Sequence, residues 1–466
     1  MWAPKPNMIV EVESLGRAKI IKIIGNKALI SLENFNHLQI EIEVSKISPI
    51  NSQNIENITN AKNATLGTKM DYSGRKTLNI EDNKLDNSIQ RIRTIESLRF
   101  GLVPEHHIEY LTLGFNDIKE WAIDTFNKCV INQPCGFEIS GPYGTGKSHT
   151  LSIIRYLARK QGFLTAHVEV DGQNISFSNP SMLLNNLWRT LAENGIDSDN
   201  PLVNLYTKAI NNGNIPQTII TSGQDRIKNN LKTIYTLIRT GNIDKYAHIV
   251  ESIISCSDEF TVTQAKKEIF SEFNIDRSQI RIEPMVSKTV SKRGFDLVES
   301  LAGHAVLAKL AGFKGLIITI DEFEIEYYDK KNHIRVEEIL NTIGQYLNGN
   351  TIYYKAPLGI YIATVDQYGY QGDPLIQRYI APNELNRYRL RVWEQEQRVK
   401  LAEKIHKIYC EAYNLENPFD KSLASKIERL LAQKIENDDS GLIRSFIKWY
   451  VGLLDLKYGP PKEKVV

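Results

Sequence analysis

The sequence predicts an α/β protein with a parallel sheet flanked by helices, preceded by a small β module and followed by a helical C-terminal region. Three observations predict this class. Apolar strands alternate with amphipathic helices between residues 88 and 394, which is typical of parallel strands joined by crossover helices. A glycine-rich turn at 141–148 separates one of these strands from the helix after it. Another apolar strand, 316–320, runs directly into two adjacent acids.

Length and composition narrow the class of protein. A chain of 466 residues is long enough for about two or three domains. Hydrophobic residues make up 42% and charged residues 24%, which is globular composition. The net charge of +2 excludes a polycationic DNA-packaging protein and leaves a local basic groove open. Four scattered cysteines, no signal-peptide pattern and no run of ~18 apolar residues predict a cytoplasmic protein without a membrane span.

The N-terminal residues 1–50 predict a small SH3-like β module or barrel. Apolar and polar residues alternate over 38–44, and Gly25-Asn26 separates two β-rich runs as a hairpin turn does. Residues 51–87 are rich in Asn, Ser, Thr and Lys, so we expect a flexible linker there. The sequence thus predicts that the β module is separate from the rest of the chain.

The remainder divides into an α/β core over 88–394 and a helical lid with a tail over 395–466, and a helical insertion at about 201–290 interrupts the core. Expected helices are 89–100, 118–130, 147–159, 182–191, 295–311 and 335–347. Expected strands are 136–140, 164–170, 316–320 and 358–363. After residue 391 the chain reads as nearly all helix.

The glycine-rich turn fits the pattern G-x-x-x-x-G-K-[ST] at each defined position. Glycines let a turn present its backbone N–H groups to an anion, and the next helix adds its positive N-terminal end. Lys147 is a charge for the β- and γ-phosphates, and Ser148 offers a hydroxyl to Mg²⁺. We expect His149 to contribute its backbone N–H. The predicted ATP contacts are Gly141, Tyr143, Gly144, Thr145, Gly146, Lys147, Ser148 and His149.

Acids at the end of a buried parallel strand lie where α/β sheets bind ligands. We expect Asp321 to hold Mg²⁺ together with Ser148, and Glu322 to orient and polarise the attacking water as a general base. Glu324 is a weaker alternative base. Thr364 follows the next strand and is a candidate to contact the γ-phosphate, although an ordinary turn residue is nearly as good an interpretation. Two acids together favour hydrolysis over binding alone.

With these motifs in place, the chain resembles the AAA+ P-loop ATPases, and more narrowly the ATP-binding proteins of BREX-type phage-defence systems. Four segments carry the resemblance over residues 88–455: 91–104 (RIRTIESLRFGLVP), 141–150 (GPYGTGKSHT), 310–324 (LAGFKGLIITIDEFE) and 440–444 (SGLIR). It implies an AAA+ core with a helical lid, ATP bound between subunits of an oligomer, and Mg²⁺ as the metal.

The resemblance also implies roles for single residues. Arg444 corresponds to sensor 2, near the γ-phosphate of its own subunit, and Thr364 or Asp366 corresponds to sensor 1. Arg378 is the candidate arginine finger for a neighbouring subunit, with Arg387 and Arg389 as rivals. Val103 and Pro104 lie where the adenine pocket is lined.

Partners follow less directly from the sequence. The stretch 387–393 interleaves arginines with aromatic residues, as DNA-backbone contacts do, but we favour helix packing there. Two functions stay open. The first is a defence ATPase that oligomerises and acts on DNA with a helicase or nuclease partner. The second is a slow ATP-gated switch or scaffold that docks a partner protein.

Overall fold

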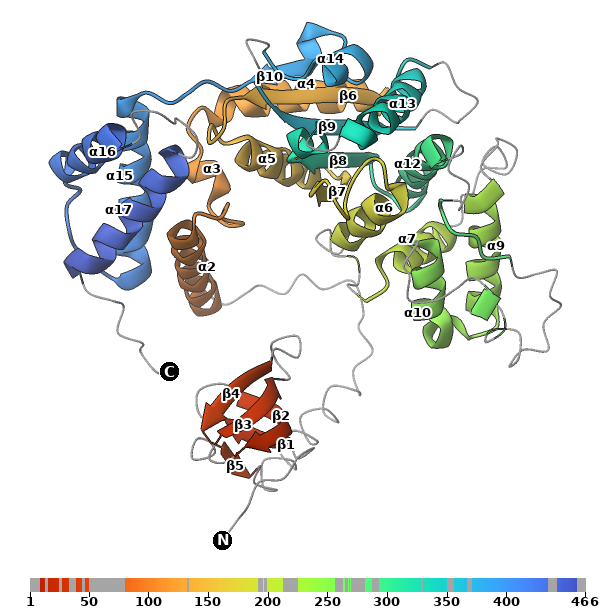
Figure 1. Ribbon diagram of the computed structural model, residues 1–466, viewed down its shortest axis with the longest axis horizontal. Helices are drawn as coiled ribbons and strands as arrows, with labels where there is room; N and C mark the ends of the chain where they lie inside the picture. The colour runs from red at the N-terminus through yellow and green to blue at the C-terminus, as the bar shows by residue number, and fades with distance from the viewer. Residues whose placement is uncertain are drawn as a thin grey trace. The chain divides into compact units, whose positions relative to one another are not determined.

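The structure is a computed structural model of the chain (Figure 1). It describes residues 9–12, 16–24, 27–32, 39–43, 47–49, 80–131, 134–191, 196, 199–212, 225–255, 263–264, 267, 269, 281–286, 293–327, 330–349, 356–366, 371–434 and 442–458. The chain divides into two compact units, Met1–Asn79 and Ile80–Val466. Most of the predicted linker and the C-terminal tail lie outside the described residues.

The first unit contains a five-stranded antiparallel sheet with the order β4-β3-β2-β1-β5. Its strands are β1 (Ile9–Val12), β2 (Gly16–Ile24), β3 (Lys27–Leu32), β4 (Gln39–Glu43) and β5 (Ile47–Pro49). Ile24 pairs with Lys27, which is the register expected for strands joined by a two-residue turn. The closure of this sheet into a barrel stays a prediction.

The second unit is built on a five-stranded sheet in which every pairing is parallel, with the order β10-β6-β9-β8-β7 (Figure 1). Its strands are β6 (Cys135–Gly141), β7 (Leu164–Glu169), β8 (Leu316–Asp321), β9 (Leu358–Val365) and β10 (Arg387–Arg389). All residues of β8 and β9 are buried, as in parallel strands that are covered on both faces. The predicted α/β fold with a parallel sheet flanked by helices is confirmed.

Helices cover both faces of this sheet. One face carries α4 (Phe115–Val130) and α5 (Lys147–Lys160), and the other carries α6 (Pro180–Arg189), α12 (Arg293–Leu310) and α13 (Lys330–Leu347) (Figure 1). The short helix α3 (Ile108–Leu111) adds Ile108 to the cluster with α4 and α5, and it also contacts α15. The period of two along β8 divides its side chains between the faces. Ile317 packs in the cluster with α4 and α5, whereas Leu316 and Ile318 pack in the cluster with α6 and α12.

In the described residues of the predicted insertion, three helices extend the second face: α7 (Pro201–Asn211), α9 (Asp225–Arg239) and α10 (Ile243–Ile254). Their buried residues belong to the same hydrophobic cluster as α12 and the sheet. The carboxyl group of Glu251 on α10 accepts bonds from the backbone N–H groups of Leu202 and Val203, at the start of α7. These helices therefore share the main core.

The C-terminal helices form a separate hydrophobic cluster, to which a helix from the start of the unit contributes. These helices are α15 (Gln395–Tyr413), α16 (Lys421–Lys434) and α17 (Leu442–Tyr458), and they pack with α2 (Ile80–Phe100). Figure 1 shows the four helices as a group apart from the sheet. Arg99 on α2 forms an ion pair with Asp455 on α17. The helix that leads into the α/β core is thus packed against the C-terminal helices.

Two elements differ from the expectations. The helix expected at 89–100 begins at Ile80, inside the range assigned to the linker. The stretch 387–393, interpreted as helix packing, is not helical: Arg387–Arg389 forms β10, which pairs with Glu138–Ser140 of β6. The alternation of Arg387, Tyr388 and Arg389 is the period of two of an edge strand. Before β10 lie α14 (Pro374–Tyr379) and the short 3₁₀ helix η6 (Glu384–Asn386).

Candidate functional site

The glycine-rich turn lies between the end of β6 and the start of α5, in the strand–turn–helix context that phosphate binding requires. Gly144 and Gly146 adopt φ values of 74° and 97°, in the left-handed region that residues with a Cβ rarely adopt. Such a turn presents its own backbone N–H groups together with those at the start of α5. The local geometry of this turn is therefore suited to binding an anion.

A cavity of about 330 Å³ opens beside this turn. The residues that line it come from α2 and the chain after it, the turn, the end of β8 and the C-terminal helices. They are Leu98, Gly101, Leu102, Val103, Pro104, Leu111, Tyr143, Gly144, Gly146, Lys147, Ser148, His149, Asp321, Glu322, Glu324, Trp393, Leu401, Ile443, Arg444 and Ile447. Most of the predicted site residues thus meet in one place. Gly141, Thr145, Thr364 and Arg378 are outside this lining.

Lys147 is buried, with 8% of its surface exposed, although it carries a charge. Its Nζ donates to the carbonyl oxygens of Gly141 at 3.3 Å and Pro142 at 3.2 Å, and it lies 5.2 Å from the centre of the Tyr143 ring. Burial lowers the pKa of Lys147, and the fields of Glu324 and then Asp321 oppose that effect. The ammonium group is therefore held at the glycine-rich turn over 141–148, within the field of these carboxylates. This turn is called the phosphate turn below, after the role that the sequence predicts for it.

Asp321 ends the buried strand β8 and is 3% exposed. Its Oδ1 accepts a hydrogen bond from the backbone N–H of Glu322 at 3.0 Å. Glu322 has a φ of 57°, so the chain turns sharply directly after the strand. Burial, followed by the charge of Asp321, raises the pKa of Glu322. Ser148 and Asp321 both line the cavity, and a hydroxyl with a carboxylate fits Mg²⁺, which prefers oxygen ligands.

Glu324, the weaker alternative in the sequence, lies in the 3₁₀ helix η5 (Phe323–Tyr327) and also lines the cavity. It is 6% exposed, and its Oε2 is buried without a hydrogen-bond partner. Burial raises its pKa to about 7. Three carboxyl groups, from Asp321, Glu322 and Glu324, therefore line the same cavity as the phosphate turn.

The ring of His149 is engaged with a neighbouring threonine. Its Nε2 lies 2.7 Å from Thr112 Oγ1, and burial lowers the pKa of the imidazole to about 4. Because the imidazole is neutral and hydrogen-bonded to Thr112, the backbone N–H is the group that His149 can offer to an anion. This geometry suits the backbone role expected from the sequence.

The cavity also has an apolar lining, which suits the face of a nucleobase. Val103 and Pro104 contribute to it, as the resemblance implies, together with Trp393, Leu401 and Ile443. The remaining apolar lining comes from Leu98, Leu102, Leu111 and Ile447. The sequence does not identify Trp393 or the apolar side chains of the C-terminal helices as part of this lining, because only the packing of α2 against those helices brings them to this place.

Arg444, on α17, lines the cavity and is exposed. Gly101 lies beside it: a Cβ at Gly101 would lie 2.9 Å from Arg444 Cγ and 2.8 Å from Lys448 Cε. Gly101 also has a φ of 72°. The absence of a Cβ at Gly101 thus lets the chain after α2 pass close to Arg444, and both residues line the cavity.

Thr364 lies at the end of β9, as the strand predicts, and its hydroxyl is already engaged. Thr364 Oγ1 donates to Glu138 Oε1 at 2.8 Å, and the same carboxyl group accepts from Asp373 N at 2.7 Å and Gln377 Nε2 at 3.0 Å. Glu138 is fully buried in β6, and burial raises its pKa. Glu138 was not among the residues predicted from the sequence, although a charged residue inside an otherwise apolar strand was the available signal.

The three candidate finger arginines differ in their surroundings. Arg387 donates to the carbonyl oxygens of Ala381 and Pro382, and Arg389 forms an ion pair with Asp366 at 3.0 Å. The side chain of Arg378 is 69% exposed, lies 3.9 Å from Glu337 and stacks over the neighbouring Tyr379 ring. Arg378 is therefore the best placed of the three to reach another molecule, and its role stays a prediction.

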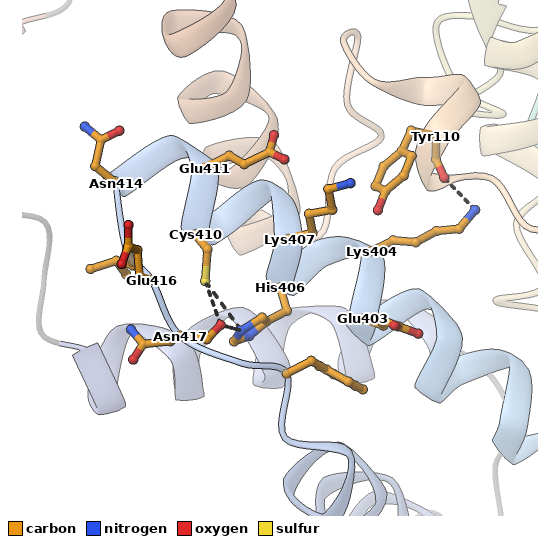
Figure 2. Close-up of a pocket in the computed structure, with 12 residues that line it drawn as sticks. Tyr110, Glu403, Lys404, His406, Lys407, Cys410, Glu411, Asn414, Glu416 and Asn417 are labelled. Atoms are coloured by element: carbon orange, nitrogen blue, oxygen red, sulfur yellow. Dashed lines mark hydrogen bonds between the residues drawn. The ribbon is translucent and has the colours of Figure 1, made fainter.

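A second, larger hollow of about 780 Å³ lies along α15 (Figure 2). Lys404 donates there to the Tyr110 carbonyl oxygen at 2.6 Å, and His406 Nε2 and Cys410 Sγ both contact the Asn417 carbonyl oxygen. Figure 2 shows these side chains spread along the helix. None of the predicted site residues lines this hollow. The residues predicted to contact the nucleotide therefore line the smaller cavity and not this hollow.

Within the described part of the chain, no helix is long and apolar enough to cross a membrane. The same residues contain no cluster of three or more histidine, cysteine or acidic side chains arranged to hold a metal ion. A metal held by Ser148 and Asp321 would take the rest of its coordination from phosphates and waters, as Mg²⁺ does at nucleotide sites.

Comparison with known proteins places the chain in a family. The model of the family described as BREX system ATP-binding protein BrxC/D matches residues 87–464. The search of curated proteins finds no match. Solved structures that match include Drosophila ORC bound to DNA (12% identity, 87% of this chain and 69% of that chain, TM-score 0.34). Another is Aeropyrum pernix ORC2 in ADPNP–ADP complexes (9% identity, 73% and 68%, TM-score 0.28). The family match covers most of the chain. The chain belongs to the family of BREX system ATP-binding proteins BrxC/D.

Proposed function

We propose that this chain is an ATPase of a BREX-type defence system, which binds ATP with Mg²⁺ in the cavity beside the phosphate turn and hydrolyses it. The observation that carries the proposal is the composition of that cavity. It brings a buried lysine at an anion-binding turn, a set of carboxyl groups and an apolar lining into one space of about 330 Å³. Family membership supports the ATP-binding part.

In this proposal each residue has a role that depends on its position in the cavity. The N–H groups of the turn over 141–149 hold the phosphates, and Lys147 neutralises the charge on the β- and γ-phosphates. Ser148 and Asp321 hold Mg²⁺, which supplies further positive charge at the phosphates when it is bound. Glu322 orients the attacking water, and Arg444 approaches the γ-phosphate from α17. Thr364 acts as a sensor through its bond with Glu138.

The AAA+ arrangement implied by the sequence extends this proposal to an oligomer in which ATP is bound between subunits. Arg378 extends from α14 toward the nucleotide of a neighbouring subunit, and its exposure supports the assignment. DNA and a helicase or nuclease of the same defence system are the proposed partners. Mass photometry with and without ATP, combined with ATPase rates on DNA of increasing length, tests the proposed oligomerisation and action on DNA. A persistent monomer with flat rates would favour the ATP-gated switch instead.

Equilibrium binding tests the site itself. We expect ATP to bind about 10- to 100-fold more weakly to a Lys147→Ala variant, because a charge-assisted contact to the phosphates is lost. Affinity should also fall from ATP to ADP to AMP as phosphate contacts are removed. Equal affinity of the wild type for all three nucleotides would overturn the assignment of the turn as the phosphate site.

A further inference from the structure

A buried carboxyl group in β6 joins the end of β9 to the start of α14. Glu138 has 0% of its surface exposed. Its Oε1 accepts from Thr364 Oγ1 at 2.8 Å and from Asp373 N at 2.7 Å, and its Oε2 accepts from Gln377 Nε2 at 3.0 Å. Two of these three donors belong to α14 and the residue that caps it, so one side chain fixes that short helix to the sheet.

The backbone at the start of α14 is shaped to meet this carboxyl group. Gly372 has a φ of 85°, and a Cβ there would lie 2.5 Å from Glu138 Oε1 and 2.6 Å from Gln377 Nε2. A glycine therefore lets the chain approach both side chains closely. Asp373 follows it and caps α14 by accepting from two backbone N–H groups of the first turn. The start of the helix is thus held at several points.

The burial of this carboxyl group has a cost that an apolar side chain would avoid. Burial disfavours the charged form and raises the pKa of Glu138. Replacing buried ionic groups by apolar groups of similar volume is often neutral or stabilising. What the carboxyl group adds is direction, because three bonds of defined geometry fix α14 and the end of β9 against β6. Its contribution is therefore the position of α14.

Both ends of this connection lead to parts of the proposed ATPase. Strand β6, which carries Glu138, ends at Gly141, where the phosphate turn begins. Gln377 directly precedes Arg378, whose side chain is 69% exposed. The strand that leads into the phosphate turn of one subunit thus also holds the helix from which the candidate finger extends.

We infer that Glu138 is a positioning residue, which holds α14 so that Arg378 reaches the nucleotide of a neighbouring subunit. This inference rests on the proposed function, in which ATP is bound between subunits. Glu138 is outside the cavity lining, so its loss should leave ATP binding in its own subunit intact and slow hydrolysis in the next one. A finger arginine contributes about 1,000- to 100,000-fold to kcat, and a displacement of about 1 Å can cost about 100-fold.

Mixed oligomers test whether Glu138 acts on the neighbouring subunit. Glu138→Ala keeps its own site and has a displaced finger, whereas Lys147→Ala binds ATP poorly and keeps its finger. In an equimolar mixture about one interface in four joins an intact site to an intact finger, so phosphate release should reach roughly a quarter of the wild-type rate, above either variant alone. Arg378→Ala should complement Lys147→Ala in the same way, and it should not complement Glu138→Ala.

Two milder variants keep the test decisive if Glu138→Ala folds poorly. Gln377→Ala removes the bond from α14 and leaves the buried carboxyl group with its other two donors. We expect it to lower kcat by about 10- to 100-fold and to change KM for ATP by less than about twofold. Glu138→Gln keeps an acceptor oxygen and should retain more activity than Glu138→Ala.

Glu251→Gln is the matched control, since it changes another buried carboxyl group that accepts from backbone N–H groups, and it should leave kcat unchanged. Three results overturn this inference and leave the ATPase proposal standing: normal kcat for Gln377→Ala, no complementation between Glu138→Ala and Lys147→Ala, or turnover by a wild type that stays monomeric. A wild type that binds ATP and releases no phosphate overturns both.

Discussion

The ion pair between Arg99 and Asp455 tests whether α2 is part of the C-terminal helical bundle. Asp455 on α17 accepts from Arg99 Nε at 2.8 Å and from Arg99 Nη2 at 2.9 Å, which is a bidentate arrangement. Tyr409 Oη on α15 donates to the same carboxylate at 2.8 Å. One aspartate therefore joins three helices, two of which are distant from α2 in the sequence.

The Asp455→Ala substitution leaves both donors without their acceptor. The side chains of Arg99 and Asp455 are 24% and 22% exposed, so solvent screens the pair only in part. The hydrogen bond to Asp455 is the largest cause of the raised pKa of Arg99. Bonds to charged groups contribute about 1.5–3 kcal/mol, and breaking a buried pair costs about 3–5 kcal/mol. For this partly buried pair we expect a loss of about 2–4 kcal/mol in the free energy of unfolding.

Urea unfolding followed by circular dichroism measures this loss. Asp455→Asn keeps an acceptor oxygen and removes the charge, so it should fall between the wild type and the alanine variant. Glu109→Ala breaks a pair with Lys160 in which the side chains are 43% and 55% exposed, and we expect it to cost less than about 1 kcal/mol. If Asp455→Ala costs no more than Glu109→Ala, the account of α2 as a member of the bundle is wrong.

Three further predictions concern single acids and their partners. Glu322→Gln should bind ATP normally and release phosphate very slowly, and near-normal release would contradict its role. Thr364→Val removes a donor to buried Glu138 and should lower the free energy of unfolding by about 1–2 kcal/mol, whereas an unchanged urea midpoint would show that this bond contributes nothing. Burial raises the pKa of Glu251 to about 7 from an ordinary value of 4.5. The raised value means that its stabilising contribution is full below pH 4.5 and is lost as the pH rises through about 7. Glu251→Gln should remove this component from the pH profile of thermal unfolding, and identical profiles would refute it.

Local sequence signals predicted the parts of the site that local geometry determines. The phosphate turn needs glycines at fixed spacing between a strand and a helix, so its residues can be recognised without knowledge of the fold. The end of β8 is similar, because the apolar run before Asp321 marks a buried parallel strand. The turn follows β6, and β6 and β8 flank β9 in the sheet, so the structure brings both segments to the cavity.

The contacts that the sequence did not predict depend on packing between distant segments. Helix α2 packs against α15 and α17 through apolar residues of a kind that any amphipathic helix carries. The hydrophobic pattern of α2 therefore does not show which helices it packs against. Glu324 lines the cavity, whereas Glu326 on the same short helix accepts bonds from Ser176 and Phe177, and the sequence does not distinguish these two acids. The bond of Thr364 with Glu138 likewise requires the register of β6 with β9.

The most direct test of the central claim is steady-state phosphate release by the purified full chain with saturating ATP and Mg²⁺, measured for the wild type and for Lys147→Ala. The account predicts turnover by the wild type and its near-complete loss in the variant, because Lys147 is the buried cation at the phosphate turn. No phosphate release by the wild type, or equal release by the two proteins, would contradict it.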